Sequence, residues 1–175
     1  EEDDECPICL DEVSLLSNYK RFACCGKVLH THCGQDLSSM EVGRNCPLCR
    51  AKTPSSDEEE VKYLRPWVKK KKAWAQDLMG QKYRDGVGVK QSYEMARRLF
   101  EQAAQQGDAG AMANLGFMYE HSEGVVQSYE RAFEYWEQAA QLGFADAQYH
   151  LGVMYYKGMG VERDIAKTRE WWTKA

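Results

Sequence analysis

Small and apolar residues recur at a fixed spacing of 36 positions through the second part of the chain, from Ala75 onward. Each repeated position keeps one kind of residue: alanine, glycine, tyrosine, glycine followed by valine, serine or aspartate, an aromatic ring, and alanine. The aligned residues are Ala75, Ala111 and Ala147; Gly80, Gly116 and Gly152; Tyr83, Tyr119 and Tyr155; Gly88, Gly124 and Gly160; Ser92, Ser128 and Asp164; Phe100, Trp136 and Trp172; and Ala103, Ala139 and Ala175. Seven such positions at one period indicate an array of structural repeats.

Each repeated position suits a pair of helices joined by a tight turn. Alanine and glycine let helices approach closely, and the tyrosine and the larger ring fill the gaps between them. Glycines near 86–88, 122–124 and 158–160 permit the positive φ of a turn. The repeated serine or aspartate is a good N-cap for the second helix of each pair. The sequence therefore predicts an all-α solenoid of helix-turn-helix repeats.

We place this solenoid at residues 73–175. Its repeats run from about 75–110, 111–146 and 147–175, and the last one is incomplete. The chain begins at Glu1 rather than Met and stops within a repeat, so we expect it to be a piece of a longer protein.

The first 50 residues have a different composition. All seven cysteines lie between Cys6 and Cys49, whereas all five tryptophans lie from Trp67 onward. A unit of about 50 residues is too small to be held by a hydrophobic core alone, so it needs another source of stability. We assign residues 1–52 to this unit.

Residues 53–72 form a linker or capping helix between the two units. Ser56 followed by Glu59 fits a capping box, and a helix starting there meets Pro66, which breaks or kinks helices. The linker is too short for free tumbling, so we expect the two units to sit in a restricted relation.

Charge and hydropathy argue against two classes of function, nucleic-acid binding and membrane spanning. The chain has 175 residues, with 23 Lys and Arg against 27 Asp and Glu. This mild acidity argues against nucleic acid as the main partner, because phosphate neutralisation needs a basic face. No stretch approaches 18 consecutive apolar residues, so we expect no membrane span.

Two pairs of cysteines frame the first unit, in the sequences CPIC (Cys6, Cys9) and CPLC (Cys46, Cys49). Two intervening residues let both sulfurs bind one ion at tetrahedral angles. Seven cysteines and one histidine would complete two four-ligand sites. A disulfide scaffold is the alternative, but an odd number of cysteines strands one thiol and the spacing is typical of metal sites. The sequence therefore predicts two bound Zn²⁺ ions.

The run CPICLDEV, a Cys/His cluster and a final CPLCR resemble a RING finger over residues 6–50. The resemblance implies a zinc-stabilised α+β fold in an interleaved cross-brace. Carried over, the first zinc ligands are Cys6, Cys9, His30 and Cys33. The second zinc ligands are Cys24, Cys25, Cys46 and Cys49.

The sequence departs from the commonest RING pattern at one ligand. The usual Cys-x-His step would place a ligand at Lys27, and an ammonium group cannot bind zinc. Adjacent Cys24 and Cys25 are assigned instead, which is a tight bite for one ion, and His32 competes with His30 as the imidazole ligand. The ligand order also resembles a PHD finger, which would usually have an aromatic residue at Arg44.

RING fingers act as ubiquitin ligases by docking a ubiquitin-conjugating enzyme. The resemblance implies an apolar groove made by Ile8, Leu37 and Pro47. It also places Arg50 at the position that bridges the conjugating enzyme and donor ubiquitin, where a planar guanidinium makes several directed hydrogen bonds. No residue is expected to form a covalent intermediate, because such a ligase works by holding the thioester in place.

The repeats resemble Sel-1-like repeats, relatives of the tetratricopeptide repeat, in the patterns LG-x2-Y, G-x-GV and AA-x2-G. The third repeat departs from the others at Thr168, where they have alanine. The resemblance implies a scaffold that binds proteins on a concave face. That face maps to the first helices as Trp74, Asp77, Gln81, Ala113, Phe117, Glu120, Tyr149, Val153 and Tyr156.

Within this face, four residues are the predicted partner-binding patch: Phe117, Tyr149, Val153 and Tyr156. Packing of these side chains inside the solenoid remains an equal alternative for them. Met112, Met118 and Met154 are expected to fill the core. His121 and His150 have no ligand-type neighbours in sequence and are interpreted as ordinary helical histidines.

Together, these patterns predict a ubiquitin ligase whose zinc unit recruits a ubiquitin-conjugating enzyme carrying ubiquitin and whose repeats bind a protein substrate or adaptor. The alternative is a non-catalytic scaffold that uses the RING fold for docking or dimerisation. A histone-tail reader of the PHD type is a third possibility. Because the repeats contain no cysteine, we expect a reducing, intracellular compartment, cytoplasmic or nuclear.

Overall fold

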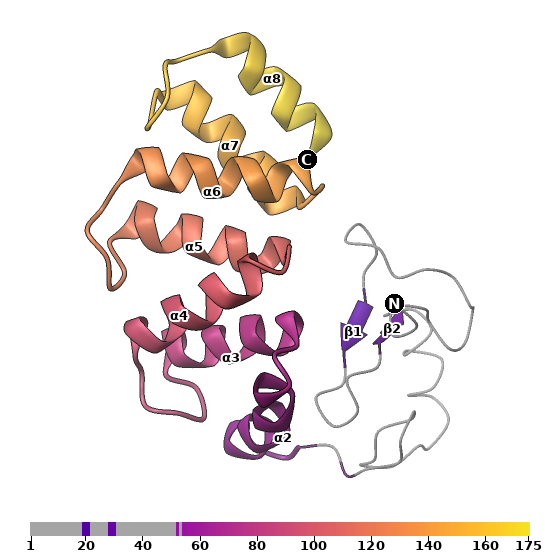
Figure 1. Cartoon of the computed structure of the whole chain (residues 1–175). Helices are drawn as coiled ribbons and strands as arrows, with labels where there is room; N and C mark the ends of the chain where they lie inside the picture. The colour runs from indigo at the N-terminus through magenta and orange to yellow at the C-terminus, as the bar shows by residue number, and fades with distance from the viewer. Residues whose placement is uncertain (1–18, 22–27, 31–51, 53) are drawn as a thin grey trace.

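The computed structural model of the chain describes residues 19–21, 28–30, 52 and 54–175. From residue 54 onward this part of the chain is an all-α solenoid of seven helices. Figure 1 shows them stacked in chain order, from α2 at one end to α8 at the other. The helices are α2 (Asp57–Lys69), α3 (Ala73–Asp85), α4 (Tyr93–Ala104), α5 (Ala109–His121), α6 (Tyr129–Gln141), α7 (Ala145–Lys157) and α8 (Ile165–Lys174).

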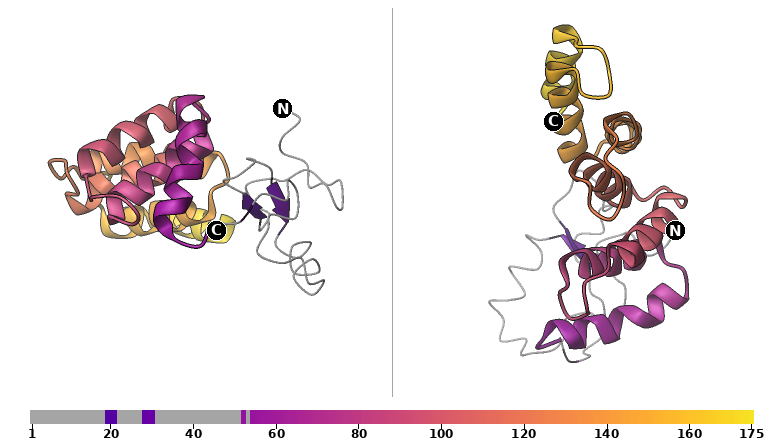
Figure 2. Two further views of the ribbon diagram at one scale, coloured as in Figure 1. Left: turned by 90° about the horizontal axis from the view of Figure 1, so that it is seen from below. Right: turned by 90° about the vertical axis from the view of Figure 1, so that its left-hand side faces the viewer.

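Each of these helices packs on its neighbours in chain order, from α2 on α3 to α7 on α8. Seen along the stack, the successive helices overlap (Figure 2, left), because each helix pair lies on the preceding pair. The predicted helix-turn-helix solenoid is therefore confirmed.

The second helix of each repeat begins at the predicted N-cap. The side-chain oxygens of Ser92, Ser128 and Asp164 accept hydrogen bonds from the third backbone N–H of α4, α6 and α8, at 3.3, 3.2 and 3.0 Å. These bonds satisfy one of the free N–H groups that every helix start exposes. The cap of α5 was not predicted: Asp108 accepts from the N–H of Ala111 at 2.9 Å.

The turns between paired helices use the left-handed backbone region. Gly86 and Gly88 both have φ of 71°, and the glycines of the later repeats are similar. Ser122 stands where the first and third repeats have glycine and still adopts φ of 62°. Its hydroxyl donates a hydrogen bond to the carbonyl oxygen of Val125 at 3.1 Å, which ties the turn locally.

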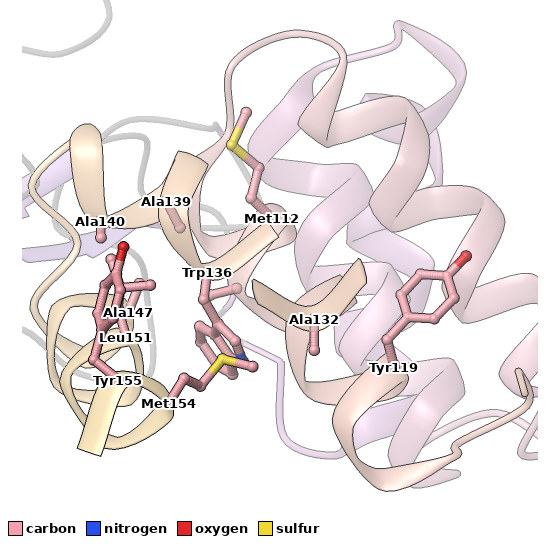
Figure 3. Packing of buried hydrophobic residues seen from close by; sticks show 11 residues of the cluster. Met112, Tyr119, Ala132, Trp136, Ala139, Ala140, Ala147, Leu151, Met154 and Tyr155 are labelled. Atoms are coloured by element: carbon pink, nitrogen blue, oxygen red, sulfur yellow. The ribbon is translucent and has the colours of Figure 1, made fainter. Parts of the chain in front are cut away.

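The aromatic ring of each second helix packs against the glycine of the first helix. A Cβ atom built on Gly80 would lie 2.5 Å from the ring of Phe100, and one on Gly116 would lie 3.0 Å from Trp136. Both rings are buried, with exposed fractions of 0% and 3%. Figure 3 shows Trp136 and Met154 in the cluster built by α5, α6 and α7. The three predicted core methionines are all buried.

Thr168 replaces the alanine of the earlier repeats and is also buried. Its hydroxyl donates to the carbonyl oxygen of Asp164 at 2.7 Å. A buried hydroxyl is tolerated when it has a hydrogen-bond partner, so the fold accommodates this departure from the repeat pattern.

Helix α2 starts at the predicted capping box but continues through Pro66 to Lys69. Ser56 caps the N–H of Glu59 at 3.3 Å, and the Glu59 carboxylate accepts from the N–H of Ser55 at 2.8 Å. Proline removes the helical hydrogen bond to the carbonyl of Lys62. Both residues lie on the exposed side, where water can satisfy that carbonyl.

In the cysteine-rich unit the structure describes one antiparallel pair of short strands, β1 (Tyr19–Arg21) and β2 (Val28–His30), with Tyr19 opposite His30. The α+β cross-brace otherwise falls on residues outside those described, and it stays a prediction. Among the described residues no helix is long and apolar enough to cross a bilayer.

Candidate functional site

The candidate site is the face that α3, α5 and α7 present, called here the first-helix face. The residues assigned to it from sequence differ widely in exposure. Asp77 and Ala113 are buried, and so they cannot contact a partner. Tyr149 and Tyr156 are 55% and 48% exposed.

Phe117 is a half-buried ring that contacts the His121 imidazole and the Arg84 guanidinium. It stacks on the His121 ring at a centroid distance of 4.1 Å, and the guanidinium of Arg84 lies 5.7 Å from its centroid. The Nδ1 atom of His121 lies 3.1 Å from the Phe117 carbonyl oxygen, which fixes the imidazole in this stack. Only part of the Phe117 ring is therefore free for a partner.

Tyr149 and Tyr156 gather around a third ring, Trp172 of α8. Their centroids lie 6.3 and 6.1 Å from the Trp172 centroid. The indole N–H of Trp172 donates to the carbonyl oxygen of Tyr149 at 3.2 Å. Trp172 is 43% exposed, so these three rings form an open aromatic group, the terminal aromatic group.

The structure thus separates the four residues of the predicted patch. Tyr149 and Tyr156 meet on Trp172, whereas Phe117 pairs with Arg84 and His121. Val153 is half-buried on α7. Trp172 was not assigned to the patch, although its place at the aromatic repeat position on α8, next to α7, gave a signal.

A buried carboxyl lies where α3 meets α5. The Asp77 carboxyl oxygens accept hydrogen bonds from the side-chain amides of Asn114 and Gln81, both at 2.8 Å. Arg84 donates to the Asn114 side-chain oxygen at 2.7 Å. The pKa of Asp77 is raised to about 7, chiefly by burial and then by the nearby charge of Asp108, while the two amide hydrogen bonds and the charge of Arg84 oppose the rise.

A different cluster lies where α5, α6 and α7 meet. The His150 ring stacks on the Trp136 indole at a centroid distance of 4.3 Å. The Glu120 carboxylate accepts from the indole N–H at 3.1 Å and lies 3.9 Å from His150 Nδ1. Burial lowers the pKa of His150, and the charge of Glu120 opposes that shift.

The two clusters share one pair of equivalent repeat positions. Arg84 and Glu120 are 36 residues apart, as are Asn114 and His150, so Arg84–Asn114 and Glu120–His150 are the same structural pair. Sequence reasoning interpreted His150 as an ordinary helical histidine. The pairing could have been found by aligning the residues that lie 30 apart across successive repeats.

The predicted zinc ligands and conjugating-enzyme contacts lie outside the described residues, except that the backbone of His30 is described at the end of β2. The residues outside are Cys6, Ile8, Cys9, Cys24, Cys25, Cys33, Leu37, Cys46, Pro47, Cys49 and Arg50. In the part of the chain that is described, no three His, Cys, Asp or Glu side chains gather closely enough to hold a metal ion.

Comparison with protein families gives two matches. The Sel1 repeat matches three times, at residues 75–108, 109–144 and 145–175. The Ring finger domain matches residues 4–50. Comparison with the curated proteins gives no match.

Among solved structures, a Sel1 repeat protein from Oxalobacter formigenes is similar, with 28% identity and a TM-score of 0.66, over 71% of this chain and 49% of its own. The protective antigen c5321 from uropathogenic Escherichia coli is 30% identical with a TM-score of 0.66, over 82% of this chain and 29% of its own. The chain therefore spans about half or less of these relatives. The cysteine rich protein B of Helicobacter pylori, 20% identical with a TM-score of 0.54, shares the fold over 65% of this chain and 86% of its own.

Proposed function

The chain belongs to the Sel1 repeat family and carries a RING-type zinc finger ahead of its repeats, and from this premise we propose that it is a ubiquitin ligase. The observation that carries the proposal is the presence of both units in one chain. RING fingers recruit ubiquitin-conjugating enzymes, and solenoid repeats bind proteins along their surfaces.

The donor atoms of the RING finger fit zinc. Thiolates and an imidazole are the ligands that tetrahedral Zn²⁺ prefers, and this unit supplies seven cysteines together with His30 and His32. We assign Cys6, Cys9, His30 and Cys33 to one ion. The other ion is assigned to Cys24, Cys25, Cys46 and Cys49. The bound ions would supply folding stability to a unit too small for its own core.

The ligase acts by position and uses no covalent intermediate. Ile8, Leu37 and Pro47 contact the conjugating enzyme, and Arg50 holds the donor ubiquitin, so that the thioester carbonyl is presented to a substrate lysine. Holding two reactants in a suitable geometry supplies much of the rate, because the entropy of bringing them together is lost in advance.

The repeats select the substrate or an adaptor. Tyr149 and Tyr156 offer exposed rings, with Phe117 and Val153 contributing partly exposed apolar surface. Exposed aromatic rings are frequent anchors of protein interfaces, because they bury a large area with few rotatable bonds. We place the protein in a reducing intracellular compartment, where free thiolates remain available to zinc.

A ubiquitination assay across a broad panel of conjugating enzymes tests the proposal. We expect ubiquitin chains with the wild type, and loss of transfer in Ile8→Ala and Arg50→Ala with zinc content unchanged at about two ions per chain. Arg44→Ala is the matched control, because it removes an arginine from the same unit outside the assigned contacts. Absence of transfer with every conjugating enzyme would refute the ligase.

The same variants separate the ligase from a non-catalytic scaffold. A scaffold that docks through its RING finger would show no transfer in the wild type, and it would keep its partners when Arg50 is replaced. Elemental analysis below about one zinc per chain would refute the ligand assignment in either case.

A further inference from the structure

Helix α2 starts one repeat period before α4. Its N-cap, Ser56, precedes Ser92 by 36 positions, and all four N-caps follow the same spacing. Each accepts a hydrogen bond from the third backbone N–H of its helix, at 3.0 to 3.3 Å. The caps are Ser56, Ser92, Ser128 and Asp164. The Sel1 repeat matches begin only at residue 75, so α2 lies outside every matched repeat.

The turn glycines contact α2 as they contact the later second helices. A Cβ built on Gly88 would lie 2.5 Å from the carbonyl oxygen of Asp57, the first residue of α2. One on Gly124 would meet Tyr93, and one on Gly160 would meet the backbone of Tyr129, the first residues of α4 and α6. In all three cases the glycine lies 31 residues after the residue it meets.

The buried ring position is also repeated in α2. Leu64 stands 36 residues before Phe100 and has an exposed fraction of 0%. It belongs to one apolar cluster with Ala75 and Met79 of α3 and with Val61 of α2 itself. Helix α2 therefore packs on α3 as a second helix packs on the first helix of the next repeat.

The chemistry of this contact differs from that of the later ones. Lys82 of α3 pairs with Asp57 at 2.8 Å and with Glu60 at 2.6 Å. One period later, the equivalent residues are Met118, Tyr93 and Ala96, which share one apolar cluster. Two ion pairs thus replace an apolar contact at the same place in the repeat.

The lysine is well placed to hold the helix. Its side chain is 18% exposed, and burial works against its charge, yet the hydrogen bonds to Asp57 and Glu60 raise its pKa overall. An ion pair that is partly withdrawn from water is screened less than a surface pair. Loss of Lys82 would leave two adjacent carboxylates without their cation.

We propose that α2 is the second helix of a fourth, incomplete repeat, and that it fixes the RING finger relative to the solenoid. The residues one period before α3 are 37–49, and they fall inside the RING finger match. Arg50 precedes Ser56 by six positions, which span at most about 20 Å of extended chain. The role of α2 in fixing the RING finger, and so in directing ubiquitin transfer, rests on the proposed ligase function. The packing of α2 on α3 does not.

Amide hydrogen exchange on the full chain tests the packing with a matched pair of variants. Gly88→Ala and Gly86→Ala introduce the same strain, because both glycines have φ of 71°. Only the first places a Cβ against the α2 backbone, since Gly86 faces the Gln91 side chain instead. We expect exchange in α2 to rise by a factor of about ten to a hundred in Gly88→Ala and to stay near wild type in Gly86→Ala.

Substituting the residues of the next repeat into α2 and α3 tests whether α2 has the register of a repeat helix. Lys82→Met alone should speed exchange in α2. Combining it with Asp57→Tyr and Glu60→Ala copies the apolar contact of the next repeat, and exchange in α2 should return to the wild-type rate or below it. If the triple variant exchanges as fast as the single one, or if both glycine variants act alike, the fourth repeat is refuted.

The functional consequence has its own readout. In self-ubiquitination of the full chain, Gly88→Ala should spread ubiquitin over more lysines of the solenoid, while discharge of the conjugating enzyme onto free lysine stays unchanged. An unchanged site pattern despite loosened α2 would refute the positioning role. Failure of the wild type to discharge at all would refute the ligase and leave the exchange results standing.

Discussion

The two inter-repeat interfaces share one pair of repeat positions but differ in the chemistry of the residues that occupy them. Between α3 and α5, the repeat positions carry a buried carboxyl and an amide: Asp77 bonded to Asn114, with Arg84 on the far side of the amide. Between α5 and α7, the positions of Asn114 and Arg84 carry His150 and Glu120, and the His150 imidazole stacks on the Trp136 indole of α6. The repeat period sets which positions come into contact, and the residue types at those positions set the kind of interaction they make.

This difference teaches that a repeat array can hold neighbouring interfaces that respond differently to the same change. In a solenoid each repeat contacts only its neighbours, so its stability is close to a sum of repeat and interface contributions. An altered residue should therefore act mainly on its own interface. The following predictions use that property, from the largest expected effect to the smallest.

Substitutions at the aromatic repeat position should give the largest difference in unfolding free energy. Phe100→Ala removes a fully buried ring and should cost about 3–5 kcal/mol in unfolding free energy. Trp172→Ala occupies the same repeat position but is 43% exposed, and we expect roughly half of that cost or less. Urea unfolding of both variants measures the difference. Equal losses would contradict the idea that coverage by the next repeat decides the value of the ring.

The cost of replacing the glycine under each ring should depend on the space between its Cβ position and the ring. Gly80→Ala places a Cβ 2.5 Å from Phe100, and this overpacking should cost about 1–3 kcal/mol. Gly116→Ala has 3.0 Å to Trp136, and a small rotation of the indole together with the better helix propensity of alanine should make it milder. Thermal unfolding of the two variants checks this order, and the reverse order would contradict it.

The α3–α5 interface should weaken as the pH rises. Because the folded-state pKa of Asp77 is raised from 3.8 to about 7, the folded state holds this proton more tightly than the unfolded state. Its contribution is complete below about pH 4 and is lost as the pH rises through about 7. Hydrogen exchange in α3 across this range should show the loss, and Asp77→Asn should remove it. Glu134→Gln, an exposed carboxyl on α6, is the control that should leave it in place.

The α5–α7 interface should respond in the opposite direction. The pKa of His150 is lowered below its ordinary 6.5, so the unfolded state binds this proton more tightly than the folded state. Stability from this site is present above pH 6.5 and is lost as the pH falls through the folded-state pKa. His150→Asn, which copies Asn114, should flatten the pH dependence of exchange in α7. An unaltered slope in that variant would assign the dependence to another group.

Much of the fold could be predicted from the sequence, because its determinants are local or periodic. The caps Ser92, Ser128 and Asp164 act within three residues, and turn glycines act at their own φ, so both can be identified in a single repeat. The path of α2 through Pro66 was harder to predict. Whether a proline ends a helix depends on how well the remaining turn packs, and packing is not a local property.

The candidate site was predicted less completely. The repeat pattern placed Tyr149 and Tyr156 on the first-helix face, but it did not assign Trp172, which completes the terminal aromatic group. Nor did it pair Lys82 with the acids of α2. Such contacts join residues 16 to 25 positions apart in sequence, and side-chain rotamers decide them within each helix crossing.

The amino-acid sequence by itself determined the period of the repeats and the starts of α4, α6 and α8, because each depends on residue type at a fixed spacing. Only the tertiary structure decided which carboxyl is buried, which imidazole is stacked and which helix packs against the first repeat. Those outcomes depend on desolvation and on the meeting of long side chains from different helices. Neither effect can be predicted from the sequence alone, since both arise only when the helices pack.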